Sequence, residues 1–267
     1  MRLVDSTLVE SDVPRPQPGR GELLIRVYAA GVTTSELLWL PTLHSKTGEK
    51  RVGAVPGHEF SGVIAGTGEG VNALAIGQEV FGMNDWFADG AMAEYCITQP
   101  SSVTSKPPRL THAEAASIPI GALTAWQGLF DRANLQPGER VLVHGGAGAV
   151  GVFAIQLAIF RGARVIATAS ARNLAFVASL GAEEVIDHRT SRFEDSVQEM
   201  DVVFDTKEAY FIVEPNQKQL AEIGAMIEEG RLHTFVDAVV PLSQASDAYA
   251  GRIERRGRGK VVVAVAD

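Results

Sequence analysis

Short apolar runs separated by turn residues characterise the first part of the chain. These runs occupy 23–27, 62–65, 79–82 and 91–97, and Gly or Pro stands near each of them. Short strands at such spacing are typical of antiparallel barrels and sandwiches rather than of parallel sheets. The pattern therefore predicts a β-barrel-like lobe at the start of the chain.

The rhythm of apolar positions changes at Thr111. Thr111 and Glu114 have the spacing of a helical capping box, and a second helical pattern covers 119–132. From Gly138 onward, predicted strands alternate with predicted helices. The strands are 141–143, 164–167, 184–186 and 201–204, and the helices are 150–160 and 173–180. Continuous apolar strands between helices indicate a parallel sheet buried on both faces.

After Asp205 the alternation breaks off. A helix is predicted from Pro215 to Glu229, and 234–266 returns to short strands with one short helix near 243–249. A complete doubly wound sheet would have a further helix and strand before that segment. We therefore expect a β lobe over 1–118, an inserted α/β lobe over 119–232, and a return to the β lobe over 233–267.

A glycine-rich segment follows the strand at 141–143 and precedes a helix. It has the form GxGxxG, and its residues are Gly146, Ala147, Gly148, Ala149, Val150 and Gly151. Glycines there allow a tight turn, and they let backbone N–H groups approach a pyrophosphate at the positive end of the next helix. The segment predicts a dinucleotide site, with a helix-packing turn as the alternative.

The end of the strand at 164–167 distinguishes between two dinucleotides. An NAD site usually has Asp or Glu about 20 residues beyond the glycine loop, whereas this chain has Ser170 and Arg172 there and no acid. A guanidinium group binds phosphate in a bidentate, charge-assisted manner, which favours the 2′-phosphate of NADPH. Alternatively, Ser170 caps the following helix and Arg172 is solvated.

Composition narrows the function classes. The formal net charge of −8 argues against nucleic-acid binding, and no apolar run reaches the ~18 residues of a membrane span. A single cysteine, Cys96, fits a reducing cytoplasm, and the N-terminus lacks the apolar core of a signal peptide. One basic cluster covers 252–260, and it is either solvated or in contact with a cofactor phosphate.

Several motifs together resemble the medium-chain dehydrogenase/reductase superfamily, in its zinc-independent quinone oxidoreductase (zeta-crystallin-like) branch. They are 56–63 (PGHEFSGV), 77–82 (GQEVFG), 90–95 (GAMAEY), the glycine-loop region 138–157, 180–187 and 259–263 (GKVVV). The resemblance implies a GroES-like β-barrel lobe with an inserted Rossmann lobe. It also implies NADPH-dependent reduction of a small quinone, an activated alkene or an enone, often by a homodimer.

The same resemblance implies roles for individual residues. Ala147 to Val150 would face the pyrophosphate, Ser170 and Arg172 the 2′-phosphate, and His188 the adenosine. Lys260 would help to hold the cofactor, and Thr124 would lie near the nicotinamide. The side chains expected near the substrate are Thr33, Trp39, Trp86 and Thr124, of which Thr33 and Thr124 are the catalytic candidates. Core packing is the alternative for both tryptophans.

The ligand set of zinc alcohol dehydrogenases is incomplete in this sequence. The chain keeps Gly57-His58-Glu59, but Thr33 occupies the first cysteine position and Cys96 is the only cysteine. Catalytic zinc needs three protein ligands. We expect no metal and a structural hydrogen-bonded pair of His58 with Glu59; a zinc alcohol dehydrogenase is a weaker alternative.

A segment typical of the family is absent after Thr206. The missing piece amounts to one helix–strand unit, roughly 30 residues long. Either Phe211-Ile212-Val213 takes the vacant place, or the sheet keeps an unpaired apolar edge. The link from Thr206 to Tyr210 is too short for a parallel crossover, so rearrangement or antiparallel pairing is expected. A protein that binds NADPH with little or no turnover is therefore the main alternative function.

Overall fold

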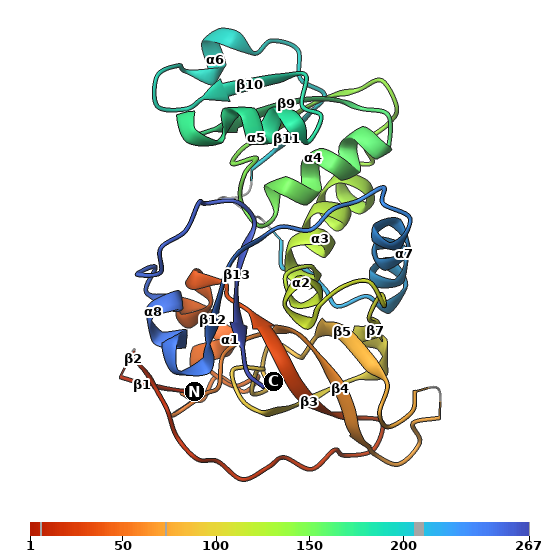
Figure 1. The fold of residues 1–267 in the computed structure, drawn as a ribbon, viewed down its shortest axis with the longest axis vertical. Coiled ribbons are helices and arrows are strands. Elements are labelled where there is room, and N and C mark those ends of the chain that lie inside the picture. The colour runs from red at the N-terminus through yellow and green to blue at the C-terminus, as the bar shows by residue number, and fades with distance from the viewer. Residues whose placement is uncertain (6, 73, 206–210, 267) are drawn as a thin grey trace.

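Two main sheets, with helices between them, form the body of the protein (Figure 1). The computed structural model describes residues 1–5, 7–72, 74–205 and 211–266. A seven-stranded, mostly antiparallel sheet forms the lower lobe, and a four-stranded parallel sheet forms the upper lobe. The first strand, β1, and the last, β13, both belong to the lower lobe, as expected for an inserted α/β lobe (Figure 1).

The lower sheet has the strand order β12-β13-β3-β4-β5-β7, and β6 also pairs with β3. Its strands are β3 (Leu23–Gly31), β4 (Glu59–Thr67), β5 (Glu79–Met83), β6 (Tyr95–Thr98), β7 (Val103–Ser105), β12 (Val236–Pro241) and β13 (Lys260–Ala264). A separate hairpin pairs β1 (Arg2–Val4) with β2 (Thr7–Val9). The short helices of this lobe are η1 (Thr34–Leu38), α1 (Leu40–Leu43), η2 (Pro100–Ser102), η5 (Leu242–Gln244) and α8 (Ala245–Tyr249).

One predicted strand of this lobe is only partly right. Residues 91–93 do not join the sheet, Glu94 only accepts a hydrogen bond from Val27 N–H of β3 (2.9 Å), and the ladder begins at Tyr95. The reason is that the N–H groups of Ala91 and Met92 donate to the carbonyl oxygens of Gly57 and Pro56, at 2.6 and 2.9 Å. The loop that contains Gly57 thereby takes the donors that a strand would use.

The upper sheet has the order β10-β9-β8-β11, with all strands parallel. Its strands are β8 (Arg140–Val143), β9 (Arg164–Ala169), β10 (Glu184–Asp187) and β11 (Val202–Phe204). The helices are α3 (Pro119–Trp126), the π-helical turn η3 (Gln127–Arg132), α4 (Gly151–Phe160), η4 (Ala171–Asn173), α5 (Leu174–Ser179), α6 (Phe193–Ser196) and α7 (Gln217–Glu228). Helix α2 (His112–Ala116) packs on strands β3 and β4 of the lower sheet. No helix in the described ranges has the length and apolar character needed to cross a membrane.

Local capping explains where two of these helices start. The predicted capping box is confirmed, because Glu114 N–H donates to Thr111 Oγ1 (3.2 Å) and Thr111 N–H donates to Glu114 Oε2 (2.8 Å). Helix α7 begins two residues later than predicted, because the side chain of Asn216 accepts hydrogen bonds from the N–H groups of Lys218 and Gln219, both at 3.1 Å. Asn216 is therefore the cap, and Pro215 lies outside the helix.

The two lobes share a hydrophobic core. Phe81 and Met83 of β5 pack in one buried cluster with Leu123 of α3, Phe153 of α4 and Ile223 of α7. These three helices lie between the two sheets (Figure 1). On the opposite face of the upper sheet, a smaller cluster is formed by Leu142, Ile166 and Ile186 with Phe193, Val197 and Met200.

The upper sheet ends at β11 in the described part of the chain. The complete doubly wound order is 3-2-1-4-5-6, and the observed order corresponds to its 3-2-1-4 part. Val203 of β11 is 58% exposed and Ile212 is 67% exposed. Of the two predicted outcomes, the apolar edge is thus observed, and Phe211-Ile212-Val213 forms no strand. The expected rearrangement at 206–210 lies outside the described residues.

The segment that follows the described gap, here called the returning segment (residues 211–216), is held away from the edge strand β11 by side-chain hydrogen bonds. The side-chain amide of Gln127 pairs with the backbone of Glu214, donating to its carbonyl oxygen (2.8 Å) and accepting from its N–H (3.0 Å). Trp86 Nε1 donates to the carbonyl oxygen of Val213 at 3.1 Å. The backbone after the gap is therefore bonded to α3–η3 and to the lower lobe instead of to β11.

Candidate functional site

The glycine loop lies at the carboxyl ends of β8 and β9. Gly146 N–H donates to the carbonyl oxygen of Thr168 (2.9 Å), and Gly145 N–H donates to Thr168 Oγ1 (3.1 Å). A Cβ atom at Gly151 would lie 2.3 Å from the carbonyl oxygen of Gly145, and one at Gly146 would lie 2.9 Å from Ile155 Cδ1. Backbone packing therefore requires glycine at Gly151, whereas a methyl group at Gly146 would crowd the end of the Ile155 side chain.

The middle of the loop is open to solvent. Gly148 is exposed, and a Cβ atom there would meet only the carbonyl oxygen of Gly145, at 3.3 Å. Among the described residues, the N–H groups of Ala149 and Val150 have no hydrogen-bond acceptor. These donors precede α4, where the helix dipole favours negative charge. The loop is thus built to receive an anionic group, and a dinucleotide pyrophosphate fits it.

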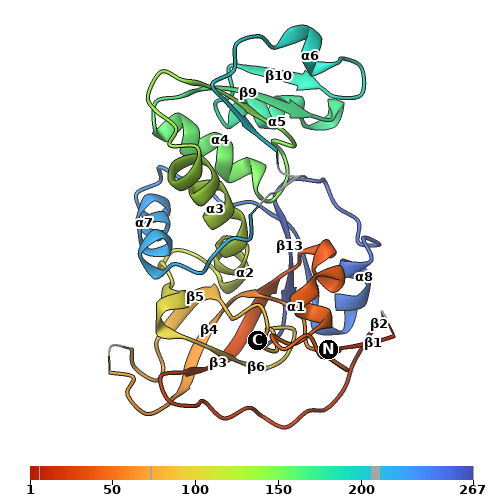
Figure 2. The ribbon, with the colours of Figure 1, turned by 180° about the vertical axis from the view of Figure 1, so that it is seen from behind.

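A cleft of about 370 Å³ opens beside this loop. Residues of both lobes line it. The segment between α8 and β13 runs from the lower lobe up to the upper lobe (Figure 2). The predicted site residues that line the cleft are Thr33, Gly148, Ala149, Val150, Arg172 and Lys260. The structure therefore brings together residues that are up to 227 positions apart in sequence.

The other predicted site residues do not line this cleft. Gly146, Ala147 and Gly151 shape the loop from within, while Thr124 is half-buried on α3. His188 is exposed at the end of β10, where its N–H donates to the carbonyl oxygen of Ala169 (3.2 Å).

Ser170 follows Ala169 directly and therefore lies near His188. Its side chain makes no capping hydrogen bond to the following helix, although Ser170 stands at the cap position. The alternative interpretation of Ser170 as a helix cap is therefore right in position, but the side chain takes no part in the cap.

The basic cluster at 252–260 divides into two kinds of residue. Arg252 points away and forms an ion pair with Asp247 (Nη2 to Oδ1, 2.6 Å). Arg255 and Lys260, by contrast, line the cleft together with Arg172. The cluster is thus neither wholly solvated nor wholly directed at the cofactor.

Lys260 is buried beneath the cleft in an ion pair with Glu59. Its Nζ also donates to Thr33 Oγ1 at 3.2 Å, and Glu59 Oε2 accepts from the N–H of Ile120 at 2.9 Å. Burial raises the pKa of Glu59, and the nearby Lys260 ammonium opposes that rise. This arrangement fixes the Thr33 hydroxyl at the wall of the cleft.

His58 pairs with Glu36 and not with Glu59, so the predicted His58–Glu59 pair is wrong. Glu36 Oε1 lies 2.5 Å from His58 Nδ1 and accepts from the N–H of Gly57 at 2.5 Å. The hydroxyl of Tyr249 donates to Glu36 Oε2 at 3.1 Å. Burial, with the negative charge of Glu36 nearby, raises the pKa of Tyr249 well above its ordinary value.

Sequence reasoning missed Glu36 because no local motif marks it, and its partners His58 and Tyr249 lie far away in the sequence. Within the described ranges, no three His, Cys, Asp or Glu side chains gather as a metal-binding group. Glu59 is directed at Lys260, so His58 has no second ligand in the Gly-His-Glu motif. The residues present do not fit a zinc site.

The two tryptophans expected near the substrate contact each other. Trp39 and Trp86 meet edge to face with ring centroids 5.2 Å apart, and Trp86 lies 5.1 Å from the His58 ring. Since the Trp86 indole N–H is already bonded to Val213, one role of Trp86 is to anchor the returning segment. The contacts of Trp86 are thus those of a packed residue.

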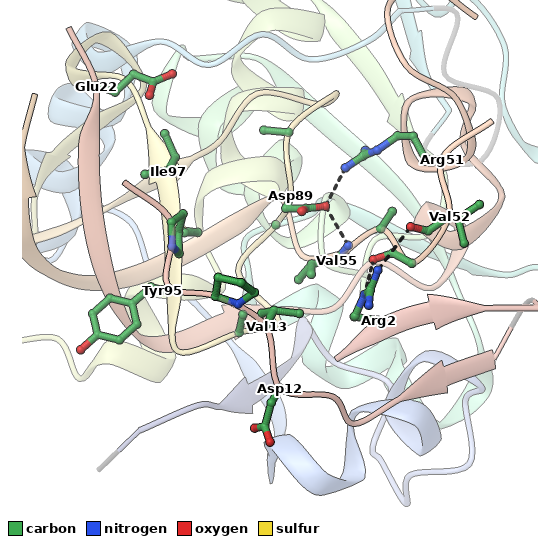
Figure 3. Close-up of a pocket in the computed structure, with 18 residues that line it drawn as sticks. Arg2, Asp12, Val13, Glu22, Arg51, Val52, Val55, Asp89, Tyr95 and Ile97 are labelled. Atoms are coloured by element: carbon green, nitrogen blue, oxygen red, sulfur yellow. Dashed lines mark hydrogen bonds and ion pairs between the residues drawn. The ribbon is translucent and has the colours of Figure 1, made fainter. Parts of the chain in front are cut away.

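A second cavity, of about 740 Å³, lies in the lower lobe (Figure 3). No predicted site residue lines it. Several of its charged groups already have partners: Asp89 Oδ1 accepts from Arg51 Nη2 (2.7 Å) and from Val55 N–H (3.0 Å). Arg2 is bonded to the carbonyl oxygen of Gly53 (2.9 Å). We therefore place the candidate site at the smaller cleft.

Two family models match the chain. Residues 19–108 match the alcohol dehydrogenase GroES-like domain, and residues 206–263 match a zinc-binding dehydrogenase domain. These segments correspond to the lower lobe and to the part of the chain that runs from the gap to β13.

Relatives cover nearly the whole chain. A 2-methylene-furan-3-one reductase of Solanum lycopersicum is 31% identical over 97% of this chain and 76% of its own length. An NADPH-dependent alkenal/one oxidoreductase of Arabidopsis thaliana is 30% identical over the same shares. A solved quinone oxidoreductase from Coxiella burnetii has a TM-score of 0.84 at 27% identity, over 96% of this chain and 94% of that chain.

The alignment with the tomato reductase also concerns the helix–strand unit that is absent after Thr206. It extends over 296 residues, which is more than the 267 residues of this chain. The relative therefore has residues without a counterpart here, in agreement with a shortened upper lobe. The fold is the expected one, a GroES-like lobe combined with a Rossmann-like parallel sheet. The chain belongs to the medium-chain dehydrogenase/reductase superfamily, in its branch of quinone oxidoreductases and enone reductases.

Proposed function

We propose that this protein is an NADPH-dependent reductase of quinones or of activated alkenes and enones, and that it works without zinc. Its family uses nicotinamide cofactors and acts on small molecules; the choice of NADPH is our proposal. The observation that carries it is the cleft in which the open N–H groups of the glycine loop meet Arg172. The similarity to an NADPH-dependent alkenal/one oxidoreductase supports the same choice.

We assign Ala149 and Val150 to the pyrophosphate and Arg172, with Ser170, to the 2′-phosphate. His188 is assigned to the adenosine, because it lies beside Ser170 at the carboxyl edge of the sheet. When bound, the reduced nicotinamide supplies a hydride. The protein supplies position and orientation.

Thr33 is our candidate for contact with the substrate. Lys260 Nζ donates to Thr33 Oγ1, so the hydroxyl hydrogen of Thr33 is left to donate into the cleft. There it can polarise a quinone or enone oxygen while a hydroxyl group or water supplies the proton. Thr124 remains a predicted contact of the nicotinamide, and it lies outside the cleft lining.

Two measurements test the proposal together. The first is a fluorescence titration with NADPH, and the second is the rate of NADPH oxidation with 1,4-benzoquinone or a simple enone. We expect saturable binding and turnover. Absence of NADPH binding would refute the proposal, and stoichiometric zinc in the active protein would refute its zinc-independent part.

A second candidate function is NADPH binding with little or no turnover. The observation that favours it is the edge position of β11, where the fifth and sixth strands of the complete order would continue the sheet. Binding with a rate of NADPH oxidation no higher than that of the protein-free mixture would select this candidate. A homodimer and a cytoplasmic location are also proposals, and they rest on the family and on the single cysteine.

A further inference from the structure

The loop before β13 is bonded directly to the upper lobe. Gly259 N–H donates to the carbonyl oxygen of Ala147 (2.8 Å), and Gly259 forms a parallel bridge with Gly148. Asn173 Nδ2 donates to the carbonyl oxygen of Gly257 (3.1 Å), and Arg258 Nε donates to Asn173 Oδ1 (2.9 Å). A segment of the C-terminal part of the chain thus closes one side of the proposed dinucleotide cleft.

Hydrogen bonds to a side chain of the lower lobe also fix the conformation of this loop. The carboxylate of Asp237 accepts from the N–H groups of Arg256 (2.9 Å) and Gly257 (2.9 Å). Gly257 has a φ of +74°, and a Cβ atom there would lie 2.8 Å from Arg172 Nη2. The guanidinium group of Arg172 therefore lies against the loop, only two residues from Arg255.

Arg172 and Arg255 line the same cleft, and in the described part of the chain neither forms an ion pair with a carboxylate. The other charged groups of the lining do have partners: Lys260 is paired with Glu59, and Asp237 is bonded to the loop amides. Two unpaired guanidinium groups in one cleft stand out in a chain with a net charge of −8. Such a pair is suited to a dianionic phosphate.

We propose that Arg255 is a specificity-determining residue that binds the 2′-phosphate of NADPH from the lower lobe, together with Arg172 of the upper lobe. This inference rests on the proposed function and adds to it that selectivity is divided between the two lobes. A sequence search at the end of β9 alone would find Arg172 and miss Arg255, which lies 83 positions later.

The neighbouring residue provides a matched control. Arg256 precedes the same glycine, is exposed, and does not line the cleft. The substitutions Arg255→Ala and Arg256→Ala therefore remove the same charge from the same loop. Since both side chains are exposed, neither change should affect folding, and the thermal melt of each variant without cofactor checks this.

The experiment measures the Kd values of NADPH and NADH by fluorescence titration, with 2′,5′-ADP and 5′-AMP as competitors. For Arg255→Ala we expect Kd to rise about 10-fold or more for NADPH and 2′,5′-ADP, and less than about 2-fold for NADH and 5′-AMP. Arg256→Ala should change all four by less than about 2-fold at moderate salt. Arg255→Lys should fall between the wild-type protein and Arg255→Ala, because one charge remains without the bidentate geometry.

Three results would overturn the inference. Unchanged NADPH affinity in Arg255→Ala refutes a role for Arg255, and an equal loss for NADPH and NADH assigns the residue to the pyrophosphate. Tighter binding of NADH than of NADPH by the wild-type protein refutes the 2′-phosphate site, with Asp237 then the candidate acid for the ribose. Failure of the wild-type protein to bind either nucleotide refutes the proposed function itself, so the two failures are distinguishable.

Discussion

At the scale of single residues, the buried Glu59–Lys260 ion pair is the part of the cleft where a substitution should destabilise the protein strongly. The Lys260 side chain is 5% exposed and that of Glu59 is 0% exposed. In Lys260→Met the buried carboxylate loses its counter-ion, so we expect the free energy of unfolding to fall by about 3–5 kcal/mol in urea denaturation. The exposed pair Lys46–Asp85 is the control, and Lys46→Met should cost less than about 1 kcal/mol.

The pH dependence of that loss follows from the pKa of Glu59. Because its folded-state pKa is raised above the ordinary 4.5, Glu59 contributes stability below 4.5 and loses it as pH rises through the folded-state pKa. Lys260 opposes the rise, so Lys260→Met raises this pKa further. The difference in the free energy of unfolding between the wild-type protein and Lys260→Met should therefore shrink as pH falls from about 8 to about 5. A deficit that grows toward low pH would contradict a carboxylate origin.

Site residues could be predicted from sequence where a motif of neighbouring residues specifies their role. The glycine loop and Arg172 follow consecutive strands, and short-range order alone brings them to one edge of the sheet. Glu36 was not predictable, because its partners His58 and Tyr249 lie 22 and 213 positions away. These three side chains come from η1, from the residue before β4 and from α8, so only the tertiary fold brings them together.

At the scale of elements, two glycines of the same loop should respond differently to substitution. A methyl group at Gly151 would lie 2.3 Å from the carbonyl oxygen of Gly145, whereas one at Gly148, which lines the cleft, would lie 3.3 Å from the same atom. We expect Gly151→Ala to lower the free energy of unfolding by about 1–3 kcal/mol, and Gly148→Ala to change it by less than about 0.5 kcal/mol. Both substitutions should also weaken NADPH binding. Urea denaturation measures the change in stability, and fluorescence titration measures the change in NADPH affinity. Unchanged NADPH affinity in Gly148→Ala would argue against a dinucleotide at this loop.

Most helices and strands could be predicted because the spacing of apolar residues indicates the type of element and the turn residues mark the same ends. The exceptions occur where an element depends on distant partners. Residues 91–94 alternate like a strand, yet Pro56 and Gly57 take up two of their N–H groups. In the same way, 211–213 is apolar enough for a strand, but Gln127 and Trp86 hold the segment elsewhere.

At the scale of the whole molecule, the two lobes could be expected from sequence but the shared core could not. The buried cluster that contains Phe81 and Met83 of the lower sheet also contains Val141 and Val165 of the upper sheet. Asn173, which is 4% exposed, adds bonds from the upper lobe to the loop before β13. Opening one lobe would therefore expose core surface of the other.

This continuity predicts a single cooperative unfolding transition despite the two sheets. In calorimetry we expect one peak, with the calorimetric enthalpy equal to the van't Hoff enthalpy. Because both lobes line the cleft, NADPH at 100 times its Kd should stabilise the whole molecule by about 2.7 kcal/mol and move that one peak upward. Two peaks, of which only one responds to NADPH, would show that the short upper sheet unfolds by itself. The unpaired edge at β11 would then be the place where unfolding begins, since Val203 is 58% exposed there.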